Sequence, residues 1–178
     1  MKRAAVGAAR SRGLRLDDLG IFWRFDPVNL CDPASLAGLA RFIEQQRIAV
    51  AFLDPSYLLL PVGDSASNMF KMGEHLAGLS RVCAATGATL VLVNHFTKSA
   101  PQGQQWAMPQ LDWLAYSGFS QWCRGWHLLN RRAPYDGEQP GRHELWVQVG
   151  GSDGQSLGLA VDIDEGRDGG EWSIEHTP

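Results

Sequence analysis

The sequence predicts an α/β fold with a mostly parallel core and a C-terminal antiparallel β-hairpin. Two apolar runs, Ile48 to Leu53 and Thr89 to Val93, have the length of parallel strands buried on both faces. A helical pattern separates them, which is the order of a strand-helix-strand crossover unit. Further on, His143 to Val149 alternates apolar and polar residues before a glycine-rich turn, as expected for a hairpin.

Composition places the chain among ordinary globular proteins. It has 178 residues, of which 44% are hydrophobic and 20% charged, and this suits one domain. A formal net charge of -3 gives no general attraction to nucleic acid, so any such binding must be local. No apolar run approaches the roughly 20 residues of a membrane span, and no stretch has a signal-peptide pattern. We expect a cytoplasmic protein without a membrane partner.

The first third of the chain predicts a helix, a strand and a second helix. Residues 1 to 15 are basic and alanine-rich, which fits an amphipathic helix or the tail of a longer one. Leu19 to Phe25 reads as a strand closed by Asp26. Asp32 and Pro33 then have the N-cap and first-turn chemistry of a helix that continues to Gln46.

The long helix of the crossover unit is predicted from apolar residues three or four positions apart between Met69 and Cys83. Gly87 provides its stop, because glycine adopts a positive φ at little cost. An apolar loop, Tyr57 to Gly63, precedes this helix. After the second strand, residues 99 to 111 hold prolines, glutamines and a glycine and are expected to form a loop at the ligand edge.

The last third predicts short elements. Ser117 and Gly118 open a short helix through Arg124, and Gly125 to Asn130 follows as a further strand of the core, which we place at residues 16–132. Residues 133–178 form the hairpin extension, with its turn at Gly150 to Gly154 and a further strand near Glu171 to Ile174. The glycine-rich turn lacks a lysine and a following helix, which argues against a phosphate cradle.

Polar residues follow both predicted parallel strands. Asp54 ends the first strand, and Asn94 and His95 end the second. A right-handed crossover brings both strand ends to one edge of the sheet, where ligands of open α/β sheets bind. Asp54 is therefore a candidate metal or phosphate-site residue, although an aspartate that caps the following turn, with Pro55 keeping it extended, has the same pattern.

Other residue types with chemical potential give weaker signals. The three cysteines are widely spaced and match neither a zinc site nor a disulfide framework, and neither Cys83 nor Cys123 lies where its pKa would fall. The five histidines show no metal-ligand spacing. An aromatic-rich segment can either stack the bases of single-stranded nucleic acid or belong to the core or a subunit contact. Its members are Trp106, Trp113, Tyr116, Phe119, Trp122 and Trp126.

Three segments together resemble a known family. Ile48 to Pro55 resembles the Walker B strand of RecA-like P-loop ATPases, particularly the hexameric replicative and RepA-type helicases gathered as AAA family ATPases. Asn94 to Lys98 is similar to the His-His-x-x-Lys segment of that group, and Ser117 to Arg124 resembles its later Gly-Ser block. The three segments occur in the family's order and span roughly residues 32 to 132.

The resemblance implies a three-layer RecA-like sheet and an ATP site. Asp54 would hold Mg²⁺ through water beside the phosphates of ATP. Asn94 and His95 would face the nucleotide, with His95 at the γ-phosphate and Lys98 near the nucleotide or single-stranded DNA. Arg124 matches the arginine of the late block.

Two further arginines follow from the same comparison. Either Arg131 or Arg132 would reach a neighbouring subunit as an arginine finger, unless the two are a solvated pair at a strand end. The family also implies a homo-oligomer, in the form of a hexameric ring.

Three departures from the family limit the activity expected of this chain. The phosphate-binding loop Gly-x-x-x-x-Gly-Lys-Ser/Thr occurs nowhere in the sequence, and no carboxylate matches the water-activating residue of the earlier strand. Asn94 also replaces the first histidine of its segment. The prediction is therefore the C-terminal portion of a RecA-like ATPase of DNA replication or unwinding, truncated at its N-terminus and not hydrolysing ATP alone. The alternative is a non-catalytic RecA-like interaction or assembly module.

Overall fold

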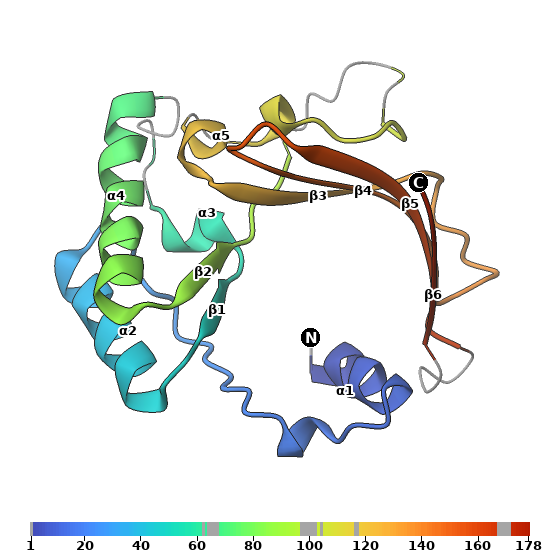
Figure 1. Ribbon diagram of the computed structural model, residues 1–178, viewed down its shortest axis with the longest axis horizontal. Coiled ribbons are helices and arrows are strands. Elements are labelled where there is room, and N and C mark those ends of the chain that lie inside the picture. The colour runs from blue at the N-terminus through green and yellow to red at the C-terminus, as the bar shows by residue number, and fades with distance from the viewer. Residues whose placement is uncertain are drawn as a thin grey trace. The chain divides into compact units, whose positions relative to one another are not determined.

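The computed structural model describes residues 2–61, 63, 68–96, 103, 105–115, 118–166 and 172–178. They belong to two compact units of mixed α/β structure (Figure 1). The parallel unit comprises Phe25–Lys98 and Asp112–Cys123, and the antiparallel unit comprises Met1–Arg24, Ser99–Leu111 and Arg124–Pro178. That residues 1–178 act as a single domain stays a prediction.

The parallel unit contains a two-stranded sheet. β1 (Val50–Leu53) pairs in parallel with β2 (Thr89–Leu92), in a register that places Leu53 beside Leu92. α4 (Met69–Thr86) connects the two strands, so the predicted strand-helix-strand unit is confirmed. The apolar segment after β1 differs from the expected loop, since it begins with the short helix α3 (Ser56–Leu59).

Helix ends in the parallel unit follow from capping chemistry. α2 (Pro33–Gln46) begins as predicted, because the Asp32 carboxylate accepts hydrogen bonds from the free N–H groups of the first turn. The Asn68 side chain accepts two similar bonds, each of 3.1 Å, at the start of α4. α4 ends at Gly87, whose φ of 69° is the left-handed stop predicted from the sequence.

The hydrophobic core of the parallel unit lies between its helices and one face of its sheet. Its buried members come from α2, α3, α4, the later short helix Phe119–Trp122, strand β1 and the connections between these elements. They are Leu30, Leu39, Ile43, Leu53, Leu59, Leu60, Met72, Leu76, Leu79, Val82, Ala88 and Phe119. The expected burial of β1 on both faces is wrong, because Val50 and Phe52 are 49% and 70% exposed.

The antiparallel unit is built on a four-stranded sheet in the order β3-β4-β5-β6. These strands are β3 (Gly125–Arg131), β4 (Arg142–Gly151), β5 (Ser156–Asp164) and β6 (Ser173–Thr177). Residues 152–155 connect β4 to β5, which confirms the predicted hairpin. β6 pairs with β5 and confirms that a terminal strand is present, although it extends beyond the predicted Ile174 and the predicted start at Glu171 lies outside the described residues. The same unit holds α1 (Lys2–Ser11), within the predicted first helix, and the 3-10 turn η1 (Leu16–Asp18).

Two strand predictions need correction. β3 pairs antiparallel with β4, so it is not a strand of the parallel core, and the described strands are mostly antiparallel. Residues 19–25 form no strand, although their composition is apolar and partly aromatic. A strand needs a neighbour for its backbone hydrogen bonds, and these residues pair with none of the described strands.

No described helix combines the length and apolar character that crossing a membrane requires.

Candidate functional site

Asp54 and His95 lie at the carboxyl end of the parallel sheet. Each is exposed and follows a strand, Asp54 directly after β1 and His95 three residues after the end of β2. The pairing continues past the strands, since Val93 N donates a 2.9 Å hydrogen bond to Leu53 O. The two side chains therefore emerge from adjacent strand ends at one edge, as the crossover unit predicted.

Tyr57 is an aromatic neighbour of His95. It belongs to α3, whose first residue, Ser56, is fully buried while Tyr57 is 49% exposed. The Tyr57 and His95 rings lie with their centroids 5.7 Å apart and their planes at 40°. The imidazole therefore has one aromatic face beside it and remains accessible to solvent.

Asn94 is held by two hydrogen bonds within the protein. Its Oδ1 accepts from Ser56 Oγ at 2.7 Å, and its Nδ2 donates to Ala115 O at 2.8 Å. Ala115 in turn donates its backbone N–H to His95 O at 3.0 Å. Asn94 thus joins the turn after β1 to the segment that follows the 3-10 turn η3 (Leu111–Trp113).

The carboxyl end of the parallel sheet has the chemistry for part of a magnesium site whose other ligands would be phosphate oxygens and water. Among the described residues, no three His, Cys, Asp or Glu side chains gather in a way that would hold a metal ion alone. Mg²⁺ in phosphoryl-transfer sites keeps several waters and needs one or two carboxylates together with phosphate oxygens. The single exposed carboxylate of Asp54 fits this chemistry, whereas it does not fit a cage made entirely of protein ligands.

Two segments of the predicted site lie only partly within the residues that the structure describes. Lys98 lies outside the described residues, and so does Ser117 of the late block. Gly118 is the N-cap of α5 (Phe119–Trp122). The φ of Gly118 is 91°, a left-handed conformation that suits glycine. The helix ends at Trp122, two residues before the predicted Arg124.

The three predicted arginines belong to the antiparallel unit. Arg124 precedes β3 and is exposed. Arg132 forms an ion pair with Asp162 on β5, and its guanidinium carbon lies 5.5 Å from the centre of the Trp146 ring. Arg131 has no carboxylate partner in the described part of the chain, and its guanidinium lies 5.3 Å from the Tyr135 ring centre.

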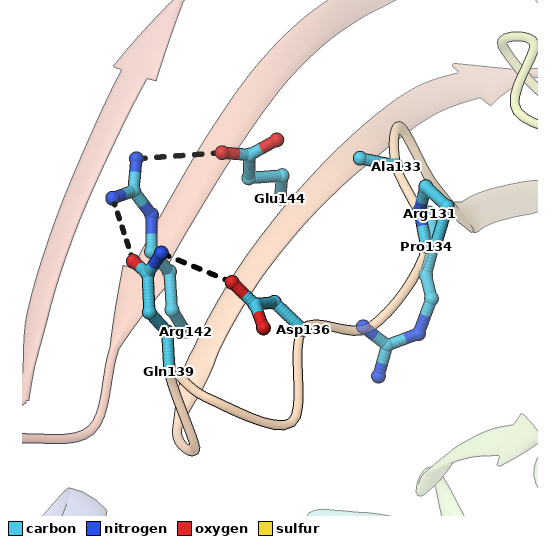
Figure 2. A pocket seen from close by; sticks show the side chains of 7 residues that line it. All are labelled: Arg131, Ala133, Pro134, Asp136, Gln139, Arg142 and Glu144. Carbon is cyan, nitrogen blue, oxygen red and sulfur yellow. Dashed lines mark hydrogen bonds and ion pairs between the residues drawn. The ribbon is translucent and has the colours of Figure 1, made fainter.

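Arg131 also lines an open cavity of about 250 Å³ beside the β3–β4 connection (Figure 2). Most polar groups of this cavity bond to one another. Arg142 bonds to Glu144 and Gln139, both at 3.3 Å, and Gln139 donates to Asp136 at 3.0 Å. Figure 2 shows that Arg131 takes no part in this chain of bonds. The cavity therefore holds one arginine without a carboxylate partner among groups that are already satisfied.

The tryptophans have separate structural partners in the two units. In the parallel unit, Trp122 Nε1 donates to Ser80 Oγ at 3.0 Å, and Trp113 contacts Phe96 edge to face. In the antiparallel unit, Trp106 supplies the backbone carbonyl that accepts from Trp146 Nε1, and Trp126 lies over Gly150. The side-chain contacts of Trp113, Trp122 and Trp126 agree with the interpretation of these three as packing residues, while Tyr116 lies outside the described residues.

Two of the cysteines, Cys31 and Cys123, have little nucleophilic character. Burial raises the pKa of the Cys31 thiol, and burial likewise raises that of Cys123 more than the hydrogen bond to its own backbone lowers it. A raised pKa leaves the thiol protonated at neutral pH, where it is a poor nucleophile. This net direction agrees with the expectation from the sequence that Cys123 does not lie where the pKa of its thiol would fall.

The sequence pattern did not single out three participants at this edge. Tyr57 was expected to begin an apolar loop, Ser56 was assigned to no element, and Ala115 carries no side-chain chemistry. Only the position of Ser56, directly after Asp54 and Pro55, offered a signal, because serine at a turn commonly bonds to nearby polar groups.

No family model matches the chain, and none of the curated proteins compared with it is similar to it.

Proposed function

We propose that the parallel unit supplies half of a Mg²⁺-ATP site in a RecA-like ATPase of DNA replication or unwinding. The observation that supports this is the parallel β1-α4-β2 unit, which ends in Asp54 on one strand and His95 on the next. An acid and an imidazole at the carboxyl edge of adjacent parallel strands have the placement required for a bound phosphate and its metal. The RecA-like fold and the remaining strands of its sheet belong to the same proposal.

Each residue has a separate task in this proposal. Asp54 holds the hydrated metal through its carboxylate, and His95 donates a hydrogen bond to the terminal phosphate. Bound Mg²⁺ would neutralise the charge that develops on the phosphates during transfer. Lys98 is proposed to lie near the nucleotide or single-stranded DNA.

Hydrolysis requires residues that these 178 do not contain. The sequence lacks the glycine-rich loop whose N–H groups and lysine bind the β- and γ-phosphates. That loop has to come from other residues, in the same or another polypeptide. We propose a homo-oligomer, such as a hexameric ring, in which an arginine of a neighbouring copy reaches the site. Arg131 suits this task better than Arg132, because Arg132 is paired with Asp162.

Binding of Mn²⁺-ATP to the purified chain tests the proposal, with Mn²⁺ as a paramagnetic substitute for Mg²⁺. We expect selective broadening of the Asp54 and His95 NMR signals, loss of this effect in Asp54→Asn, and no ATP turnover by any form. Asp26→Asn is the matched control, since Asp26 is also exposed, precedes a proline and lies in the same unit. Equal broadening in wild type and Asp54→Asn would remove Asp54 from the site. Turnover by the chain alone would contradict the argument from the missing loop.

A non-catalytic assembly module is the second candidate. Large apolar side chains favour it, because Phe52 and Phe70 of the parallel unit are 70% and 80% exposed. Exposed apolar groups of this kind occur at protein interfaces. Sedimentation of wild type, Phe52→Ser and Phe70→Ser separates the two candidates: self-association that the substitutions abolish, with no Mn²⁺-ATP effect, favours the module.

A further inference from the structure

The amide of Asn94 lies between two fixed partners. Ser56 is fully buried, and its Oγ donates to Asn94 Oδ1 at 2.7 Å. On the other side, Asn94 Nδ2 donates to the carbonyl of Ala115 at 2.8 Å. A carbonyl oxygen only accepts, so the nitrogen of the amide must face Ala115 and the oxygen must face Ser56. The orientation of this amide is therefore determined by its partners.

Backbone hydrogen bonds extend the same cluster. Ser56 N donates to Val93 O at 2.9 Å, and Ala115 N donates to His95 O at 3.0 Å. Phe96 and Leu114 form an antiparallel bridge directly beyond. Three segments, one after each parallel strand and one after η3, are thus tied together, and the Asn94 side chain is the group that bonds to both of the others.

A direct ligand role for Asn94 competes with these bonds. One of its two Nδ2 hydrogens bonds to Ala115 O and its Oδ1 accepts from Ser56, so a nucleotide could use Asn94 as a donor only through the second N–H, unless it displaced Ala115 O. Asp54, His95 and Tyr57 are exposed at this edge, whereas Asn94 is half-buried. The geometry suits a role for Asn94 in positioning the exposed residues rather than in binding a ligand directly.

We propose that Asn94 is a positioning residue, which fixes the backbone of His95 relative to Asp54 through Ser56 and Ala115. The proposal rests on the Asp54 and His95 site described above. Ser56 and Asn94 hold the two strand ends at a set separation, and Ala115 holds the His95 peptide. Pre-organisation of this kind is what keeps groups at a phosphate site in productive geometry.

Ser56→Ala and Asn94→Ala test the proposal, with Asn130→Ala as the matched control. Asn130 Nδ2 also donates to backbone carbonyls, those of Gln105 and Ala107, but in the antiparallel unit. In both site variants we expect at least tenfold faster hydrogen exchange of the Ala115 amide and a shifted His95 Hε1 resonance, because the imidazole moves relative to the Tyr57 ring. Asn130→Ala should destabilise the chain without either change, so general destabilisation is distinguished from loss of positioning.

A measurement on the wild type covers the case in which the variants do not fold. One Asn94 Nδ2 hydrogen should exchange markedly more slowly than those of exposed Asn29. Equal exchange, or site variants that fold and leave Ala115 and His95 unchanged, would overturn the proposal. Mn²⁺-ATP broadening is recorded on the same samples. Its absence in wild type contradicts the proposed ATP site, whereas the exchange and resonance data still decide the role of Asn94.

Discussion

Trp122 Nε1 donates a 3.0 Å hydrogen bond to Ser80 Oγ and so joins α5 to α4. The Trp122 ring also packs against the core of the parallel unit. An indole that is bonded and packed in this way contributes to stability through both its N–H group and its apolar area. Its role is thereby distinguished from that of an exposed ring that stacks on a nucleic-acid base.

Replacement of Trp122 should therefore lower the free energy of unfolding. Trp122→Phe is expected to cost about 1 kcal/mol or more, because it removes the hydrogen bond and part of the ring. Urea denaturation followed by circular dichroism measures the change. Trp23→Phe is the control, since Trp23 is exposed and lies outside the helices and strands. An equal effect of both substitutions would show that Trp122 does not stabilise the fold in the way that its contacts indicate.

Leu76 and Phe70, both on α4, provide a direct comparison of buried and exposed apolar residues. Leu76 is fully buried and Phe70 is 80% exposed. Leu76→Ala is expected to destabilise the parallel unit by about 2 to 5 kcal/mol, because it leaves a cavity in the core. Phe70→Ala should change stability far less. Chemical denaturation of the two variants checks the order, and a larger loss in Phe70→Ala would contradict the core assignment.

The crossover unit could be predicted because its signals are local. Helical spacing, the Asp32 cap and the Gly87 stop act within a few residues, and the structure has each of them. Two apolar runs joined by one helix then leave little choice but parallel pairing. The placement of Asp54 and His95 at one edge follows from that topology alone.

The failures concern pairing and packing partners that the residues of a segment do not themselves specify. The composition of β3 gives no indication that this strand pairs with β4 rather than with a parallel strand, since an apolar strand has the same composition in either sheet. The exposure of Phe52 likewise depends on what covers the second face of the sheet. The Ser56, Asn94 and Ala115 cluster was missed because two of its bonds span 38 and 21 residues.

The thiols of Cys31 and Cys123 give a pH dependence of stability. Burial raises the pKa of both, so the folded state favours the protonated thiol. Their contribution to stability is fully present below the pKa of the unfolded thiol, about 8.5, and is lost as the pH rises through the higher folded pKa. The difference in free energy of unfolding between wild type and the double variant with Cys31→Ala and Cys123→Ala should therefore shrink between pH 7 and pH 10. A difference that stays constant would contradict this.

Gly150 is required in the antiparallel unit because of Trp126. A Cβ atom at Gly150 would come within 2.4 Å of Trp126 Cζ2 and 2.6 Å of Cε2, which is far inside van der Waals contact. Gly150→Ala should therefore displace the indole and destabilise the unit by about 1 to 3 kcal/mol, with a change in tryptophan fluorescence. Gly137→Ala is the control, since a Cβ there meets no atom within 4 Å and its φ is not positive. If Gly150→Ala is as stable as Gly137→Ala, the Trp126 ring does not lie across β4 in solution.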